Sequence, residues 1–331
     1  MNLRRPVAAD VLDAHERLRG TVVETPLLRS DAIDAQVGGR VFVKCENLQV
    51  SGAFKFRGAY NCLSRLDRSV YPGGAVAYST GNHGQAIATV GRMLGVSTTI
   101  VMPNDAPRVK IARARACGAE VVLYDRHKEK REEIAAAIAE KNPVAIVPPG
   151  DDPYVIAGQG TAAGEALRAL VGVVVDVVLV PCGGGGLAAG TCLATEAHRS
   201  KADVWAAEPA DFDDTRRSLV SGNREVNLKL AGSICDALLA PTPAELPFSI
   251  NRERLSRVLS ADDASVAAAM RLAYEELRLV VEPGGAVGLA ALLASPGCLN
   301  GKTAVVIASG GNVDATVFAR ILSQQSDRVA A

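Results

Sequence analysis

Short runs rich in β-branched residues alternate with alanine-rich stretches along most of the chain. The β-branched runs predict strands over residues 40–45, 75–78, 97–102, 120–124, 145–147, 173–180, 204–207 and 303–308. Several of these runs are apolar at successive positions, which is typical of parallel strands covered by helices on both faces. The stretches between them predict helices over residues 85–94, 109–117, 134–141 and 187–198. This alternation predicts an α/β fold with largely parallel sheets.

The composition favours a small molecule as the binding partner. The 36 basic residues balance 36 acidic ones, so charge gives no reason to expect nucleic acid or a membrane surface as a partner. The seven cysteines are scattered and none stands in a CxxC spacing, which predicts reduced thiols in a cytoplasm. The longest apolar stretch, residues 171–181, is too short for a bilayer span, which needs about 20 apolar residues.

A single lysine stands among small and aromatic residues in the segment SGAFKFRGAY, residues 51–60. Most lysines in such a context are surface residues at the start of a helix. An accessible but partly desolvated amine is, however, the nucleophile that a Schiff base to a carbonyl cofactor needs. Phe54 is placed to lie against a cofactor ring, so Lys55 is a candidate Schiff-base lysine.

Polar residues and glycines follow the predicted strand 75–78 in the segment STGNHGQ, residues 79–85. Free amides at a helix N-terminus, together with hydroxyls and a side-chain amide, make an anion pocket. The carboxyl end of a strand in an α/β sheet is where ligands bind. The alternative is a capped helix with Ser79 or Thr80 as the N-cap.

Four consecutive glycines follow a buried strand and precede a helix in PCGGGGLAAG, residues 181–190. Their amides and the helix dipole are suited to hold a phosphate. A dinucleotide fold is a rival interpretation, because Gly184, Gly186 and Gly190 form a loose GxGxxxG and Glu208 follows about 20 residues on. A purely structural glycine turn is a third.

The last such segment is SGGNVD, residues 309–314, after the predicted strand 303–308. A serine at the carboxyl end of a strand, followed by two glycines, can set its hydroxyl against a flat ligand. A simple turn is the alternative.

Taken together and in this order, the four segments resemble the fold-type II pyridoxal-phosphate enzymes, and most of all the threonine/serine dehydratase and serine racemase family. The similarity extends to TPLL (25–28), KCENLQ (44–49), VMPNDAPRVK (101–110), GAEVVL (118–123), VIAGQGT (155–161) and VEPGGA (281–286). The resemblance implies two open, twisted, mostly parallel sheets flanked by helices. It also implies a large cofactor domain, residues 1–70 and 152–331, and a small mobile domain, residues 71–151.

The resemblance implies a role in binding pyridoxal 5'-phosphate for matching positions. Lys55 would hold the cofactor covalently, Phe54 would pack on its ring, Asn82 would contact the ring hydroxyl and Ser309 would meet the pyridine nitrogen. The phosphate would lie on Gly183, Gly184, Gly185, Gly186 and Leu187. The substrate carboxylate would lie on Ser79, Thr80, Asn82 and His83.

The resemblance further implies an ammonia-lyase that converts a β-hydroxy amino acid such as L-threonine or L-serine to a 2-oxo acid and ammonia, in a homodimer. The main alternative is an amino-acid racemase. Thr80 stands where racemases of this family have a serine as second acid/base, and threonine is bulkier and stiffer at χ1, which argues against efficient racemisation. Further alternatives are a dehydratase of a hydroxyectoine-derived amino acid, a protein that binds the cofactor without turnover and an NAD-dependent oxidoreductase.

The segment AEPADFDD, residues 207–214, resembles the divalent-cation site of the racemase branch. Glu208 and Asp214 would supply carboxylates, and the main-chain carbonyl of Phe212 a third oxygen. Oxygen ligands suit Mg²⁺, Mn²⁺ or Ca²⁺. A solvated acidic turn is the alternative.

Overall fold

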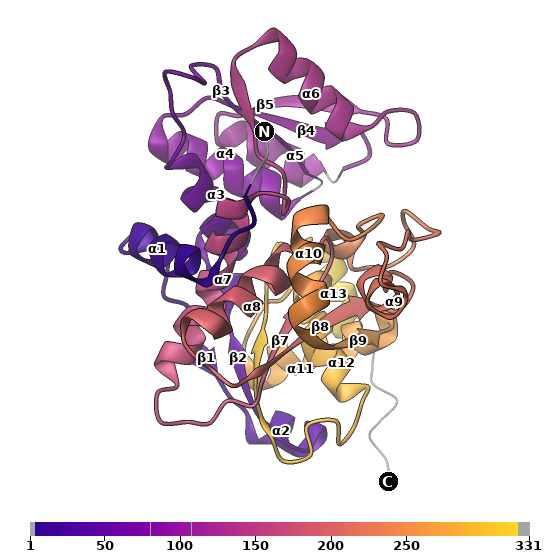
Figure 1. Ribbon diagram of the computed structural model, residues 1–331. Helices are drawn as coiled ribbons and strands as arrows, with labels where there is room; N and C mark the ends of the chain where they lie inside the picture. Colours follow the sequence, from indigo (N-terminus) through magenta and orange to yellow (C-terminus); the bar gives the residue numbers. More distant parts are fainter. Residues whose placement is uncertain (1–3, 80, 107, 324–331) are drawn as a thin grey trace.

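The computed structural model describes residues 4–79, 81–106 and 108–323, and its strands form two separate sheets (Figure 1). The larger sheet has the order β1-β2-β10-β7-β8-β9, with strands β1 (Leu27–Leu28), β2 (Arg40–Lys44), β7 (Val177–Pro181), β8 (Asp203–Pro209), β9 (Leu255–Ala261) and β10 (Thr303–Ile307). The smaller sheet has the order β5-β4-β3-β6, with strands β3 (Gly74–Tyr78), β4 (Thr98–Pro103), β5 (Glu120–Tyr124) and β6 (Val144–Ile146). Among the described strands every neighbouring pair is parallel except β1 and β2, which confirms the predicted class.

Both faces of the larger sheet are buried under helices. Val177 and Leu179 of β7 belong to one hydrophobic cluster, and Val178 and Val180 to another. Successive side chains of a strand point to opposite faces, so a strand covered on both faces is apolar throughout. One face is covered by α2 (Asp31–Val37), α11 (Asp263–Leu277), α12 (Pro283–Leu293) and α13 (Ala315–Ser323), and the other by α1 (Ala8–Leu18), α7 (Pro153–Ala169), α8 (Gly186–Ala197) and α10 (Glu245–Arg254).

The smaller sheet lies at one end of the molecule with its own helices, at the top of Figure 1. Its faces are covered by α4 (Asn82–Leu94) and α5 (Arg108–Ala116) on one side and α6 (Arg131–Lys141) on the other. Helix α3 (Lys55–Leu63) packs on α4 and also on α7, so it lies between the two sheets. The segment between β6 and α7 then returns the chain to the larger sheet.

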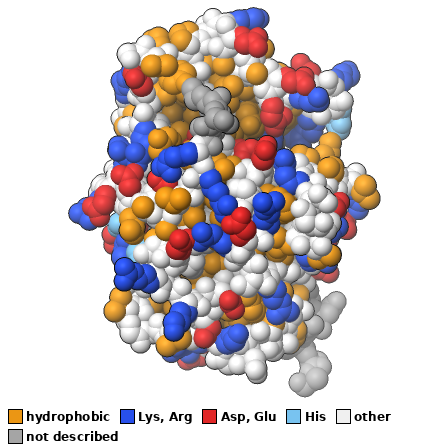
Figure 2. Space-filling view, in the orientation of Figure 1, with side chains coloured by type: hydrophobic (Ala, Val, Ile, Leu, Met, Phe, Trp, Pro, Cys, Tyr) orange, Lys and Arg blue, Asp and Glu red, His pale blue; other side chains and the backbone are white. Residues whose placement is uncertain are grey.

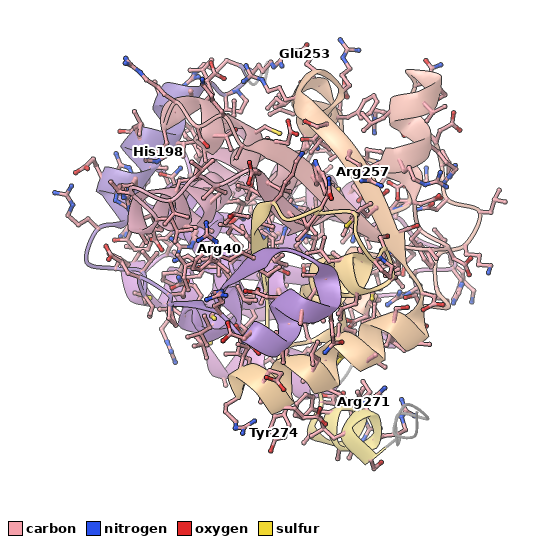
Figure 3. The ribbon with its side chains drawn as sticks, turned by 90° about the horizontal axis from the view of Figure 1, so that it is seen from below. Arg40, His198, Glu253, Arg257, Arg271 and Tyr274 are labelled. Atoms are coloured by element: carbon pink, nitrogen blue, oxygen red, sulfur yellow. The ribbon has the colours of Figure 1, made fainter. Side chains whose placement is uncertain are left out.

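The last described helix, α13, is fixed to α11. The Arg271 guanidinium donates to the carbonyl of Ile321 at 3.2 Å, and the rings of Tyr274 and Phe318 meet edge to face with centroids 5.8 Å apart. Figure 3 shows Arg271 and Tyr274 on α11 beside α13. Helix α13 therefore completes the layer that α11 and α12 form over one face of the larger sheet.

The face of the molecule in Figure 2 carries lysine and arginine interspersed with aspartate and glutamate. Side chains of one sign do not gather into a single field on this face, in keeping with the balanced composition. None of the described helices combines the length and hydropathy that a membrane span requires.

Most element boundaries differ by one to four residues from the sequence-based predictions, and two of these differences have a clear physical reason. The strand predicted over residues 173–180 begins only at Val177, because Val174 is 75% exposed and Asp176 turns its carboxylate to the amide of Thr303 at 2.8 Å. The helix predicted over residues 85–94 begins earlier, at Asn82, with Gly81 rather than Ser79 at the N-cap. Its apolar periodicity starts at Ala86, so periodicity could not locate the first turn.

Candidate active site

The segment that carries Lys55 is paired with the end of β10. The amide of Phe54 donates to the carbonyl of Ser309 at 3.0 Å, and the amide of Gly311 donates to the carbonyl of Gly52 at 2.9 Å. Ala53 and Gly310 form an antiparallel bridge between these bonds. The first and last of the four segments singled out in the sequence therefore lie side by side at the carboxyl edge of the larger sheet.

Lys55 is half-buried at the first position of α3. Its amine donates to the carbonyl of Pro149 at 2.6 Å and lies 5.1 Å from the centroid of the Phe54 ring. Burial lowers the pKa of Lys55 to about 8. An amine that loses its proton so close to neutral pH is a far better nucleophile than an exposed lysine.

The glycine loop reaches the same place through Gly150, the residue after the acceptor of Lys55. A Cβ on Gly186 would lie 3.1 Å from the Cα of Gly150, so the two backbones are in contact. Gly185 is the N-cap of α8 with φ of 89°, a conformation that favours glycine, and a Cβ there would lie 2.7 Å from the Asn251 amide nitrogen. Leu187 is buried in the same hydrophobic cluster as Phe54.

These glycines fit the phosphate of pyridoxal phosphate. The first amides of α8 have no acceptor within their helix, and the positive end of the helix dipole lies with them. Side chains at Gly185 or Gly186 would fill the space in which the backbones approach. A bare helix N-terminus next to a desolvated lysine suits a phosphorylated aldehyde.

Asn82 lies in the first turn of α4 and reaches across to the larger unit. Its amide nitrogen donates to the carboxyl of Glu282, and its oxygen accepts from the amide of Asn312 at 2.9 Å. Asn82, Glu282 and Asn312 are named here the Glu282 clasp. Sequence analysis assigned a role only to Asn82. Glu282 belongs to the quoted VEPGGA motif and Asn312 to SGGNVD, so both lay within motifs already noticed.

Ser79 and His83 flank the start of α4. The Ser79 hydroxyl accepts from the amide of Gly81 at 3.1 Å. His83 is buried, with Nε2 against the carbonyl of Val147 at 3.0 Å, and its Nδ1 has no partner among the described residues. Burial, reinforced by the charge on Lys55, lowers the pKa of His83 to about 3, so its ring is neutral at neutral pH. Thr80 lies outside the described residues.

Ser309 is buried directly after β10, 4% exposed, beside the chain that leads to Lys55. Lys55, Phe54, Asn82, the glycine loop and Ser309 thus lie around one region, each tied to a neighbour there by a backbone or side-chain contact. Sequence analysis assigned no role to Pro149, whose carbonyl orients Lys55.

A fully buried ion network lies behind this region, two residues along α3 from Lys55. Arg57 forms paired hydrogen bonds of 2.6–2.8 Å with Glu46 and with Glu165, and Lys44 donates to Glu165 at 2.7 Å. The Thr25 hydroxyl donates to Glu46 at 2.6 Å. Lys44, Glu46, Arg57 and Glu165 are named here the Arg57 network. Its two positive and two negative charges fix the start of α3 against β2 and α7.

The predicted cation ligands lie at the end of β8, which contains Glu208, and in the residues from there to the start of α9 (Asp214–Ser221). Glu208 is fully buried, and its two oxygens accept from the amides of Thr215 and Arg216 at 2.9 and 3.0 Å, in the first turn of α9. Burial, with the nearby Asp214, raises the pKa of Glu208 to about 8. Burial raises the pKa of Asp214 to about 6, and its Oδ2 has no partner among the described residues. No group of three His, Cys, Asp or Glu side chains within the described ranges is arranged to hold a metal.

The chain matches the family described as "Pyridoxal-phosphate dependent enzyme" over residues 18–310. An L-threo-3-hydroxyaspartate ammonia-lyase from Pseudomonas sp is 42% identical over 313 residues, which cover 95% of this chain and 97% of that protein. A serine racemase from Schizosaccharomyces pombe is 38% identical over 98% of this chain and 99% of its own length. Among solved structures, the serine racemase from Dictyostelium discoideum is 35% identical with a TM-score of 0.87, over 94% of this chain and 100% of that one.

Proposed function

The chain belongs to the family of pyridoxal-phosphate dependent enzymes, and from that premise we propose that it is an ammonia-lyase that dehydrates a β-hydroxy amino acid. The observation that carries the proposal is the half-buried amine of Lys55, which lies between the Phe54 ring and the peptide that touches the glycine loop. Two relatives of similar length named as ammonia-lyases, and a third named as a dehydratase, support the same reaction class.

Each residue of the site has a task in this reaction. When bound, pyridoxal phosphate supplies the electron sink for charge that develops at the substrate Cα. Lys55 would hold the cofactor and would act as the base for the Cα proton, a task that its lowered pKa suits. Ser309 would meet the ring nitrogen and Asn82 the ring hydroxyl. The glycine loop with Leu187 would hold the phosphate.

The substrate carboxylate would bind at the start of α4, to Ser79, Thr80, Asn82 and His83. A neutral His83 donates from one ring nitrogen to Val147 and keeps the other as an acceptor, so it adds no charge to this pocket. The amides at the helix N-terminus supply the attraction for the anion. Loss of the Cα proton and the β-hydroxyl as water would leave an enamine, which water then hydrolyses to a 2-oxo acid and ammonia.

The substrate class we propose includes L-threonine, L-serine and L-threo-3-hydroxyaspartate. Relatives with 42%, 39% and 37% identity are named for hydroxyaspartate, which extends the list beyond threonine and serine.

Racemisation is the second candidate activity, because serine racemases are 35–38% identical to this chain over nearly its whole length. A panel of the three amino acids separates the possibilities. Release of 2-oxo acid measures the lyase reaction, and chiral analysis of the remaining amino acid measures racemisation.

Absorbance tests the cofactor assignment. Purified protein should have a visible absorbance band that disappears on borohydride reduction. The reduction should leave the cofactor covalently attached, as a label, to the peptide that contains Lys55. Lys55→Ala should abolish the covalent label and lower turnover by at least about a thousandfold, as expected on loss of the nucleophile and base together. Lys141→Ala, on an exposed turn of α6, is the matched control and should behave as wild type. Normal turnover in Lys55→Ala would overturn the proposal.

We further propose that Glu208, Asp214 and the carbonyl of Phe212 hold Mg²⁺, Mn²⁺ or Ca²⁺. Two buried carboxyls whose ionisation burial makes costly, one of them with an unpaired oxygen, are suited to a divalent cation. The amides that already bond to Glu208 leave it fewer free lone pairs, so Asp214 is the stronger ligand in this arrangement.

We also propose a cytoplasmic homodimer with residues 71–151 as a small mobile domain. Seven free cysteines support a reducing compartment. The last turn of α9 and the segment after it expose several apolar side chains suited to an interface, namely Val220, Val226, Leu228 and Leu230. The domain assignment is supported by the smaller sheet, whose strands all come from residues between Gly74 and Ile146.

A further inference from the structure

Glu282 is a buried acid that does not cap its own helix. It precedes α12 as the N-cap residue and is 2% exposed, yet its side chain makes no capping bond. One carboxyl oxygen accepts from Asn82, and the other has no partner among the described residues. A buried carboxyl oxygen without a partner is costly, so such atoms call for an explanation beyond stability.

The loop after Ser309 sets the position of this carboxyl. A Cβ on Gly310 would lie 2.0 Å from the bonded oxygen of Glu282, so only glycine leaves room for it there. The amide of Glu282 donates to the carbonyl of Gly310 at 3.0 Å, which fixes the backbone as well. The acid is therefore held beside the residue that follows Ser309.

The clasp also dictates how the amide of Asn82 is turned. Its oxygen is taken by Asn312, whose nitrogen also donates to the carbonyl of Ser51 at 2.9 Å. Its nitrogen donates one hydrogen to Glu282 and retains a second. Asn82 thus keeps one N–H for a further partner, and its orientation is fixed by the bonds at both ends of the amide.

Charged and titratable groups face Glu282 from two elements, η3 (Asp236–Leu238) and α5. Asp236 lies on η3, Lys110 on α5 and the Cys235 thiol beside η3, and Lys110 is itself paired with Asp236 at 2.5 Å. Arg113 of α5 reaches Asn312 at 3.4 Å. Burial raises the pKa of Glu282 to about 7, Asp236 adds to the rise, and Lys110 and Asn82 oppose it. This carboxyl therefore gains or loses its charge close to neutral pH.

We propose that Glu282 is a positioning residue of the cofactor site, which orients the Asn82 amide toward the ring and keeps one ionisable oxygen free at that site. The inference rests on the proposed function, since the ring in question is that of pyridoxal phosphate. It adds Glu282 to the site. It also explains why position 310 is a glycine and why Asn312 bonds to Asn82. It also makes the polarity around the ring depend on pH in the neutral range.

Glu282→Gln tests the inference, because glutamine keeps the shape and can still accept from Asn82 but does not ionise. The readout is the visible absorbance of the bound cofactor, recorded from about pH 6 to pH 9. We expect the wild-type spectrum to change with pH near neutrality. In Glu282→Gln the midpoint should move by at least about one pH unit or disappear, since removal of a nearby charge shifts a neighbouring titration on that scale. Unchanged thermal unfolding would show that the variant folds.

A double-mutant cycle tests the link to Asn82. Glu282→Ala and Asn82→Ala should each weaken cofactor binding to the apoprotein about tenfold, the scale of one lost hydrogen bond to an ionisable group. The double variant should lose little more than either single one, because the two residues act through one contact.

Glu253→Gln is the matched control, because Glu253 is exposed and pairs with Arg5, and neither residue has a role in the site. It should titrate as wild type. An unshifted midpoint in Glu282→Gln, or fully additive losses in the cycle, would overturn the inference while the proposed function stands. A wild-type protein that takes up no cofactor would instead overturn the proposed function.

Discussion

The Arg57 network and the Glu282 clasp are both buried polar groups, and they differ in how their atoms are paired. In the Arg57 network the guanidinium bonds to two carboxylates and to Thr161, and Lys44 bonds to Glu165 and to the carbonyl of Thr25. In and near the clasp, polar atoms of Glu282, His83 and Ser51 have no partner among the described residues.

This difference separates structure from function within one site. A buried ion pair with every group bonded holds its neighbours in place, although it adds little net stability over an apolar core. Buried atoms without partners reduce stability, so they persist where a ligand completes them. Here the complete network lies behind Lys55 and the incomplete group lies around it, so the protein fixes the backbone of α3 and leaves the ligand-facing side unsatisfied.

The largest effect should come from Arg57. Arg57→Met leaves Glu46 and Glu165 buried without their main partner, which should lower the free energy of unfolding by about 3–5 kcal/mol. Arg57→Lys keeps the charge but loses the paired geometry and should cost less. Urea denaturation measures both. A loss below about 1 kcal/mol for Arg57→Met would show that Glu46 and Glu165 do not depend on Arg57 as their partner. The contrast between a fully paired Arg57 network and an incompletely paired Glu282 clasp would then fail.

An intermediate effect should appear in the pH dependence of stability at the proposed cation site. Glu208 and Asp214 have pKa values raised to about 8 and about 6, so the folded protein keeps protons that the unfolded chain releases. The contribution of these two carboxyls to stability should therefore fall as pH rises from about 5 to about 8, by several kcal/mol in the presence of chelator. Mg²⁺ should restore stability at the upper pH only, since metal binding needs ionised carboxylates.

Glu208→Gln is the control for that prediction, because it removes the proton with the larger shift. Its unfolding free energy, measured by urea denaturation at both pH values with chelator, should fall less than that of wild type. Equal pH slopes for the two proteins would contradict it. The proposed cation site would then resemble the Arg57 network, in which every charged group is paired within the protein and no ligand is needed.

The smallest effect should come from a matched pair of hydroxyls. The Thr25 hydroxyl donates to Glu46, whereas the buried Ser51 hydroxyl has no partner among the described residues. Thr25→Val should cost about 1–2 kcal/mol, and Ser51→Ala should change stability by less than about 0.5 kcal/mol. Thermal unfolding without cofactor measures both. Equal losses of stability would mean that the Ser51 hydroxyl has a partner, such as ordered water. The hydroxyls of Thr25 and Ser51 would then both be hydrogen-bonded.

The strands with apolar residues on both faces were predictable from sequence, and β9 was not. Residues 177–180 are apolar in unbroken succession because helices cover both faces. Strand β9 lies at the edge of the sheet and exposes Ser256 and Arg257, so its sequence lacks that signal. Arg257 stacks on Trp205 of β8 at 5.0 Å, a contact that only the fold brings about.

The residues of the site also differ in how far the sequence reveals them. Lys55, the glycine loop and Ser309 follow strands and stand among glycines, so the chain itself marks them. Glu282 follows a loop and precedes a helix, and its partner Asn82 is 200 residues away. Local pattern cannot pair two residues across such a separation. Arg57 was missed for a related reason, since Glu165 stands alone in an alanine-rich helix 108 residues further on.

The position of β10 has a consequence for how this protein is made. This strand lies between β2 and β7, so the middle of the larger sheet comes from residues 303–307 and its neighbours from far earlier in the chain. The smaller sheet uses one continuous stretch and can assemble while synthesis continues. During synthesis, about 250 residues are added after Lys55 before Ser309 and its loop leave the ribosome. The pocket around Lys55 can therefore form only late in synthesis.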